Sequence, residues 1–145
     1  MDFQVYYHFW INEEDPKIAK ICPNPEWKHP LATGQWMMFF QTNEIDEKWK
    51  QAVNLYRSGK LIGVHAMRVS TMRENFRRSD NFFHVILYFC GPSEDKDFMI
   101  KIGQNLLKNI QYKNLYGAMF YTDVQAFLGS GDKVQGKYKI DVPKC

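Results

Sequence analysis

The sequence FFHVILYFC at residues 82–90 is a continuous run of apolar, β-forming residues that ends at Gly91-Pro92. Such a run is typical of a strand buried on both faces near the middle of a sheet. Residues 60–70 are rich in β-forming side chains and predict a second strand. The polar residues 71–81 between them predict a loop, so we expect the two strands to form an antiparallel hairpin.

Two segments with helical periodicity flank this pair of strands. In residues 45–57, acidic residues begin the segment and Gly59 follows its end. In residues 93–110, Ser93 is a predicted N-cap and an apolar stripe runs along one face. The stripes consist of Ile45, Trp49, Val53 and Tyr56 in the first helix and of Met99, Ile102, Leu106 and Ile110 in the second.

Shorter β-forming segments complete the predicted sheet. Residues 36–41, 116–121 and 137–142 each predict a strand, and residues 3–11 predict an edge strand. The resulting order is β-α-β-β-α-β with a closing strand. It predicts an α+β fold in which two helices cover one face of a curved antiparallel sheet. The same order fits a ferredoxin-like sandwich, which is the alternative fold.

The chain has 145 residues and a mass of 17.2 kDa, and 45% of its residues are hydrophobic. These values predict a single domain over residues 1–145 and exclude a disordered or collagen-like chain. Residues 1–35 have no sustained periodicity and contain four prolines. We expect them to form an extended N-terminal arm.

The three cysteines, Cys22, Cys90 and Cys145, are too few and too scattered for a disulfide framework. The first residues lack the basic segment of a signal peptide. No apolar run approaches the roughly 18 residues that a membrane helix needs. These features predict an intracellular protein, cytoplasmic or nuclear, that does not enter a membrane.

Positive charge is concentrated in the second part of the sequence. Residues 1–49 carry 4 Lys/Arg and 8 Asp/Glu, a net charge of −4, and residues 50–145 carry 15 and 8, a net charge of +7, which sum to +3. A cluster of basic residues attracts phosphate groups, although the same residues also suit a solvated surface. The candidate phosphate-binding residues are Arg68, Arg73, Arg77, Arg78, Lys133 and Lys137.

The motifs in the sequence do not support catalysis or a metal site. Residues 131–137 match a phosphate-binding G-x-x-x-x-G-K loop, but Tyr138 occupies the position of the Ser or Thr that binds magnesium. The four histidines lack zinc-site spacings, and Cys90 has no base at a recognisable spacing. We therefore expect no metal, no cofactor and no catalysis, and a nucleotide-processing enzyme is the third functional alternative.

Four aromatic residues have two interpretations each. Trp10 and Trp27 either pack the arm onto the domain or stack on a base of a bound nucleotide or RNA. Trp49 and Tyr56 either belong to the core or form an exposed anchor for a partner. The alternatives to packing predict a nucleotide or RNA ligand near the arm and a peptide partner on the helical face.

Several short motifs resemble the cap-binding translation initiation factor 4E family. Together they span residues 27–140, which is most of the chain, and they imply a 4E-like fold. The matching segments are Trp27-Lys28-His29-Pro30-Leu31 followed by Trp36 and Phe39-Phe40, then Asp46-Glu47-Lys48-Trp49, residues 82–90, residues 100–103 and residues 130–140.

The order of motifs is closer still to the basophilic leukaemia-expressed protein family, an uncharacterised group with the 4E-like fold. The shared motifs are Gly34-x-Trp36, Asp46-x-x-Trp49, Gly59-Lys60-Leu61, Val69-Ser70 and Tyr121-x-Asp123.

The sequence departs from true cap binders at the base-binding residues. Those proteins hold methylguanine between a tryptophan on the loop after the first strand and a Trp-Glu pair on a later loop. Here Phe40 runs almost directly into the first helix, and no Trp-Glu pair follows residue 60. The resemblance therefore implies a non-catalytic binding domain for a nucleotide, an RNA end or another phosphate-bearing ligand. A protein-interaction module is the alternative.

Overall fold

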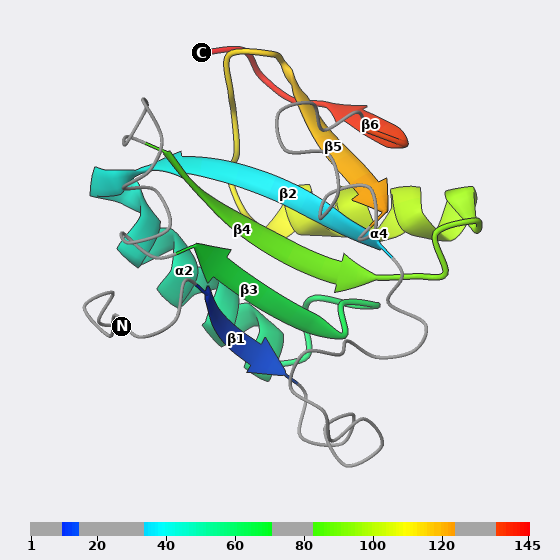
Figure 1. Ribbon diagram of the computed structural model, residues 1–145, viewed down its shortest axis with the longest axis horizontal. Coiled ribbons are helices and arrows are strands. Elements are labelled where there is room, and N and C mark those ends of the chain that lie inside the picture. The colour runs from blue at the N-terminus through cyan, green and yellow to red at the C-terminus, as the bar shows by residue number, and fades with distance from the viewer. Residues whose placement is uncertain (1–9, 15–33, 71–82, 124–135) are drawn as a thin grey trace.

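The computed structural model describes residues 10–14, 34–70, 83–123 and 136–145. They form a six-stranded sheet in the order β1-β3-β4-β2-β5-β6, in which every neighbouring pair is antiparallel (Figure 1). The strands are β1 (Trp10–Glu14), β2 (Gly34–Gln41), β3 (Ala66–Ser70), β4 (Phe83–Cys90), β5 (Ala118–Asp123) and β6 (Tyr138–Asp141), and the helices are α2 (Thr42–Arg57) and α4 (Lys96–Asn109).

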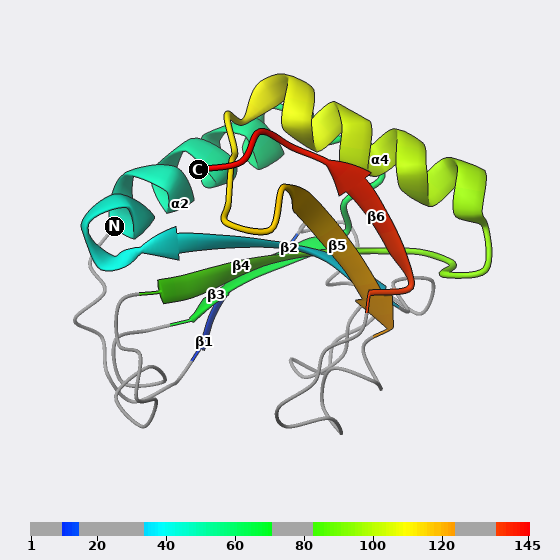
Figure 2. The same cartoon turned by 90° about the horizontal axis from the view of Figure 1, so that it is seen from above.

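The predicted α+β architecture is confirmed. Strand β4, predicted from residues 82–90, lies inside the sheet between β3 and β2. It pairs with β2 along its full length, and its pairing with β3 is antiparallel, as the predicted hairpin requires. Helices α2 and α4 cover the same face of the curved sheet, and among the described residues no helix lies on the other face (Figure 2).

The two helices begin differently from one another. Helix α2 follows β2 directly at Thr42. Helix α4 is preceded by Asp95, whose carboxylate accepts a hydrogen bond from the backbone N–H of Phe98 at 3.3 Å. The prediction that Ser93 is the N-cap is therefore wrong. A carboxylate suits this position because it accepts the N–H bond and also interacts with the positive end of the helix dipole.

Two strands differ more from their predicted bounds than the others, whose ends shift by one or two residues. The strand expected at residues 60–70 begins only at Ala66, because Gly59 and Gly63 adopt positive φ angles of 77° and 82° that interrupt an extended chain. The edge strand expected at residues 3–11 is found at the edge of the sheet, where the described strand β1 continues to Glu14; residues 3–9 lie outside the described ranges. The predicted arm at residues 1–35 and the loop at residues 71–81 lie largely or wholly outside the described residues.

The core between the helices and the sheet contains two buried tryptophans, Trp36 and Trp49. The Trp36 indole Nε1 donates a hydrogen bond to the Met99 carbonyl of α4 at 3.0 Å. A Cβ atom added at Gly103 of α4 would lie 2.7 Å from that indole ring. Because Gly103 has no side chain, α4 approaches the sheet closely, and Trp36 sets the position of the helix.

The face of the sheet opposite α2 and α4, on which the described ranges place no helix, is apolar as well. Side chains alternate along a strand, so the neighbours of Trp36 on β2 point away from the helices. The apolar centre of this face is 2–6% exposed, which confirms that the central strands are buried on both faces. We call it the helix-free face, and its residues are Gln35, Met37, Phe39, Ala66, Arg68, Val85, Leu87, Phe89, Phe120 and Thr122.

Candidate functional site

A buried amide lies on the helix-free face at the beginning of β2. Gln35 is 1% exposed, and its cross-strand neighbours are Phe89 on β4 and Thr122 on β5. Its side-chain Nε2 has no hydrogen-bond partner. Nearly all buried polar groups in proteins have a partner, so a buried donor without one requires an explanation.

A guanidinium group lies on the other side of the same aromatic ring. Arg68 of β3 is half-buried, and its Cζ atom lies 5.7 Å from the centroid of the Phe89 ring. This is a cation–π distance. Gln35 on β2 is the cross-strand neighbour of Phe89, so the helix-free face carries a guanidinium on one side of β4 and an amide on the other. Arg68 is one of the predicted phosphate-binding residues.

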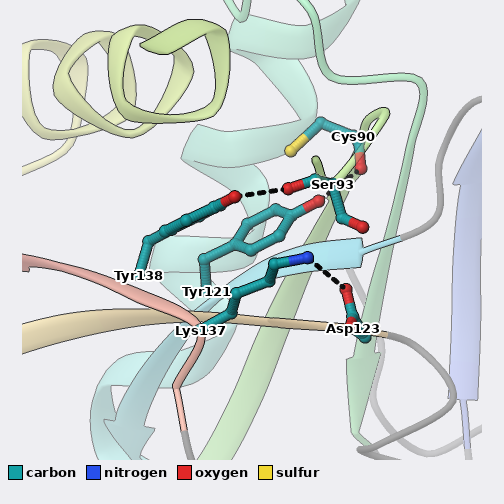
Figure 3. A network of polar contacts seen from close by, with 6 residues as sticks. All are labelled: Cys90, Ser93, Tyr121, Asp123, Lys137 and Tyr138. Atoms are coloured by element: carbon teal, nitrogen blue, oxygen red, sulfur yellow. Dashed lines mark hydrogen bonds and ion pairs between the residues drawn. The ribbon is translucent and has the colours of Figure 1, made fainter. Parts of the chain in front are cut away.

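A second predicted residue, Lys137, lies just before β6. Its ammonium nitrogen is 3.9 Å from the Asp123 carboxylate and 5.8 Å from the centroid of the Tyr138 ring (Figure 3). The side chains of Lys137 and Asp123 are 35% and 41% exposed. An ion pair that is this long and this accessible contributes little to stability. Lys137 can therefore exchange Asp123 for another anion at small cost.

Arg68 and Lys137 do not form one phosphate site. Strand β3 is separated from β6 by β4, β2 and β5, which places the two strands about 19 Å apart at the usual spacing between strands. A single phosphate group does not reach both side chains. A ligand that contacts both has to extend across the sheet.

The other residues predicted to bind a ligand are not tested by the described part of the chain. Trp10 belongs to β1, where its backbone pairs with Ser70 at the edge of the sheet. The remaining predicted residues lie outside the described ranges: Trp27, Arg73, Arg77, Arg78 and Lys133.

A polar network connects the end of β4 to β5 and β6 (Figure 3). The Tyr121 hydroxyl donates to the Cys90 carbonyl at 3.0 Å, and the Tyr138 hydroxyl donates to the Ser93 carbonyl at 2.7 Å. The two tyrosine rings stack with centroids 5.5 Å apart. Burial raises the pKa of the Cys90 thiol and of the Tyr121 hydroxyl. Neither group is therefore activated as a nucleophile. The network instead holds the end of β4 against β5 and β6.

On the helical face, the prediction that Trp49 is an exposed anchor for a partner is wrong. Trp49 is 2% exposed and belongs to the core, so its side chain is not an exposed anchor. Its position on the apolar stripe, between Ile45 and Ala52, turns the indole toward the sheet. Tyr56 is half-buried, packs against the same core and donates its hydroxyl to the His65 carbonyl at 2.8 Å.

Sequence reasoning did not select Gln35, Phe89 or the exposed residues Ile62 and Phe98. The available signal for Gln35 was a polar residue inside a strand that is apolar on both faces. Ile62 and Phe98 are 65% and 37% exposed, which the periodicity of the sequence does not indicate. In the ranges that the structure describes, His, Cys, Asp and Glu side chains do not gather into a group of three that suits a metal ion. Neither α2 nor α4 has the length and apolar character needed to cross a bilayer.

The architecture is similar to that of a solved translation factor. The structure of schistosome eIF4E complexed with m7GpppA and 4E-BP matches with a TM-score of 0.66 at 14% sequence identity, over 94% of this chain and 73% of that chain. The fold is 4E-like. The four inner strands keep the order expected of the ferredoxin-like alternative, and β1 and β6 extend the sheet on either side of them. No protein-family model and no curated protein matches the sequence.

Proposed function

We propose that the chain is a non-catalytic binding domain that recognises a phosphate-bearing ligand, a nucleotide or an RNA end, at the helix-free face. The observation that carries this proposal is the Arg68 guanidinium on the Phe89 ring beside the Gln35 amide. Guanidinium groups bind phosphate through several N–H donors in a fixed geometry. The 4E-like neighbour, which holds m7GpppA, supports the choice of ligand class.

Further basic and aromatic residues complete the proposed site. The basic residues neutralise phosphate charge, and the two tryptophans of the N-terminal part stack on a base. The phosphate-binding set is Arg68, Arg73, Arg77, Arg78, Lys133 and Lys137, and the stacking set is Trp10 and Trp27.

Titrations of the purified chain with m7GpppA, GTP and a short 5′-phosphorylated RNA test this function. If the protein neutralises three phosphates of the ligand, its affinity should fall roughly tenfold or more when the salt concentration rises from 50 to 200 mM. The reason is that binding releases counterions from the phosphates, and added salt opposes that release. The double charge reversal Arg77→Glu/Arg78→Glu should weaken binding without changing the melting temperature. Lys101→Glu is the matched control, because Lys101 is an exposed residue of α4 on the opposite side of the sheet. Absence of binding to all three probes, or binding that salt does not affect, contradicts the proposal.

A peptide partner on the helical side is the second candidate function. Ile62 and Phe98 are exposed apolar residues on that side. A Cβ added at Gly63, the residue after Ile62, would lie 3.4 Å from the Phe98 ring. Ile62 and Phe98 therefore border one apolar patch. Tyr56 remains the predicted partner-binding residue of α2. The 4E-like neighbour is complexed with 4E-BP, which supports a peptide as the partner class.

Titration with a 4E-BP peptide tests this second function. The variants Ile62→Ser and Phe98→Ala should each weaken binding several-fold. A few apolar anchor side chains contribute most of the binding energy of an interface, so truncating one of them lowers the affinity. Leu115→Ser is the matched control, because Leu115 is 64% exposed in the turn that follows the other end of α4. Equal affinities for all variants, or no binding by the unmodified chain, rule this candidate out.

We also propose that the chain belongs to the basophilic leukaemia-expressed protein family. The support is the order of shared motifs, of which Trp36 and Trp49 both lie in the core between the helices and the sheet. A solved structure of a member tests it. Its matching tryptophans should occupy the same two core positions, and a different location contradicts the assignment.

A further inference from the structure

Strand β6 forms one edge of the described sheet. It pairs with β5 on one side, and no other described strand pairs with its outer side (Figure 1). The outer side of an edge strand carries backbone N–H and C=O groups to which a further strand can bind. The side chains of the edge strand decide whether such pairing is favoured or opposed.

The register between β5 and β6 fixes which backbone groups of β6 face outward. The N–H of Val142, directly after β6, donates to the Gly117 carbonyl at 3.0 Å. Backbone groups alternate between the two sides of an antiparallel strand, so Ile140 also turns its N–H and C=O toward β5. The N–H and C=O groups of Lys139 and Asp141 therefore face outward.

The side chains of β6 alternate between a charged row and an apolar row. Lys139 and Asp141 are both exposed, and they point to the same side of the strand because they are two residues apart. The half-buried side chains of Tyr138, Ile140 and Val142 pack against the core. A lone lysine on an edge strand opposes pairing with a second copy. A lysine and an aspartate on the same side make the edge complementary to itself.

Two copies of β6 that pair antiparallel around a two-fold axis have one favourable register. With Ile140 opposite the same residue of the second copy, Lys139 of each copy lies opposite Asp141 of the other. The outward N–H and C=O groups of these residues then form two pairs of hydrogen bonds, and each pair joins opposite charges. Opposite charges directly across two strands stabilise their pairing, whereas like charges destabilise it.

The two neighbouring registers are less favourable. A shift in one direction places Lys139 opposite Lys139 and requires Lys137, whose N–H already donates to the Tyr121 carbonyl at 2.6 Å. A shift in the other direction places Asp141 opposite Asp141 and requires Pro143, which has no N–H group to donate. Charge and backbone groups therefore select the same register.

We propose that two copies of the chain associate through β6, with Lys139 of each copy opposite Asp141 of the other. The sheet then continues across the two-fold axis. Such an interface is the same on both copies and closes on itself, so it produces a dimer. The other edge strand, β1, does not offer the same pattern. Its charged residues, Glu13 and Glu14, are both acidic, so two copies of β1 would bring together charges of one sign only.

Charge reversal of the two residues tests the register. Sedimentation equilibrium of the unmodified chain should give a mass that rises with concentration toward twice 17.2 kDa. Lys139→Asp and Asp141→Lys should each weaken association roughly tenfold or more, because two attractive cross-strand pairs become repulsive. An equimolar mixture of these two variants should regain the affinity of the unmodified chain, and so should the double variant Lys139→Asp/Asp141→Lys. In both cases opposite charges again lie across from each other.

The matched controls are Lys101→Asp and Glu47→Lys. These residues are exposed on α4 and α2, and their replacement changes the net charge by the same amounts. Both controls should associate as the unmodified chain does. Hydrogen exchange gives a second measurement. The backbone amides of Lys139 and Asp141 should exchange more slowly at high protein concentration, because they then donate hydrogen bonds across the interface.

Loss of association in both single variants, with recovery in their mixture and slower exchange at Lys139 and Asp141, supports the proposal. A mass of 17.2 kDa at all concentrations up to about 1 mM overturns it, because the chain then does not self-associate. Association that is unchanged in both single variants also overturns it, because the interface then lies elsewhere. If the mixture of the two variants fails to associate, the proposed pairing of Lys139 with Asp141 is wrong.

Discussion

Replacement of Gly103 by alanine tests how closely α4 approaches the sheet. The added Cβ would lie 2.7 Å from two atoms of the Trp36 indole and 2.6 Å from the terminal Cδ1 of Ile140. The isoleucine end can move, but the indole is held by its hydrogen bond to Met99 and by an edge-to-face contact with Tyr121, whose ring centroid lies 5.4 Å from that of Trp36. The clash with Trp36 therefore decides the effect.

Two opposing contributions set the magnitude of the change in stability. Alanine is favoured over glycine inside a helix by about 1 kcal/mol. Overpacking of a dense core costs about 1–3 kcal/mol. The sum is a loss of about 0–2 kcal/mol in the free energy of unfolding, and we expect Gly103→Ala to lie toward the upper end because a rigid, buried indole gives way less than a flexible side chain. Urea unfolding followed by far-UV circular dichroism measures this difference.

A double-mutant cycle with Trp36→Phe identifies the cause. The smaller ring removes the indole atoms that meet the new Cβ, so Gly103→Ala should be neutral or stabilising in the Trp36→Phe background. Gln104→Ala, at an exposed position of the same helix, should change stability by less than about 0.5 kcal/mol. A stabilising effect of Gly103→Ala in the unmodified chain would refute the close packing of α4 on Trp36.

Three further predictions follow from buried or half-buried side chains. Trp49→Ala should lower the free energy of unfolding in urea by about 3–5 kcal/mol, and a loss below about 1 kcal/mol would mean that the indole is exposed. Asn114→Ala should cost about 1–3 kcal/mol in the same assay, because the Asn114 side chain bonds Tyr112 at 3.0 Å and both backbone polar groups of Ala118 at 2.6 and 3.3 Å; unchanged stability would contradict this role. Burial raises the pKa values of Tyr88 and Tyr121 above the ordinary value of 10, so the stability they contribute is present below pH 10 and decreases as the pH rises above it. Urea unfolding at several alkaline pH values checks this, and constant stability up to about pH 11.5 would contradict it.

The elements of the fold follow from local patterns. Residues 82–90 predict β4 because the apolar run is too short and too rich in β-formers for a helix, and its burial on both faces excludes an edge strand. The apolar stripe of residues 45–57 predicts α2 and places Trp49 on its inner side. Boundaries are less well determined. The start of β3 depends on the positive φ angles of Gly59 and Gly63, and the choice of Asp95 over Ser93 as the N-cap depends on where the chain turns.

The candidate site depends on relations between strands that are distant in the sequence. The sequence identifies Arg68 and Lys137 as basic residues without indicating that β4, β2 and β5 separate them. It contains Gln35 and Phe89 without indicating that they are cross-strand neighbours. Local residue patterns, which reflect backbone preferences and hydrophobic periodicity, thus determined the strands, the helices and the basic character of the chain by themselves. Only the tertiary structure decided which side chains share a face and which polar group is left without a partner, because strand order and register arise from long-range pairing.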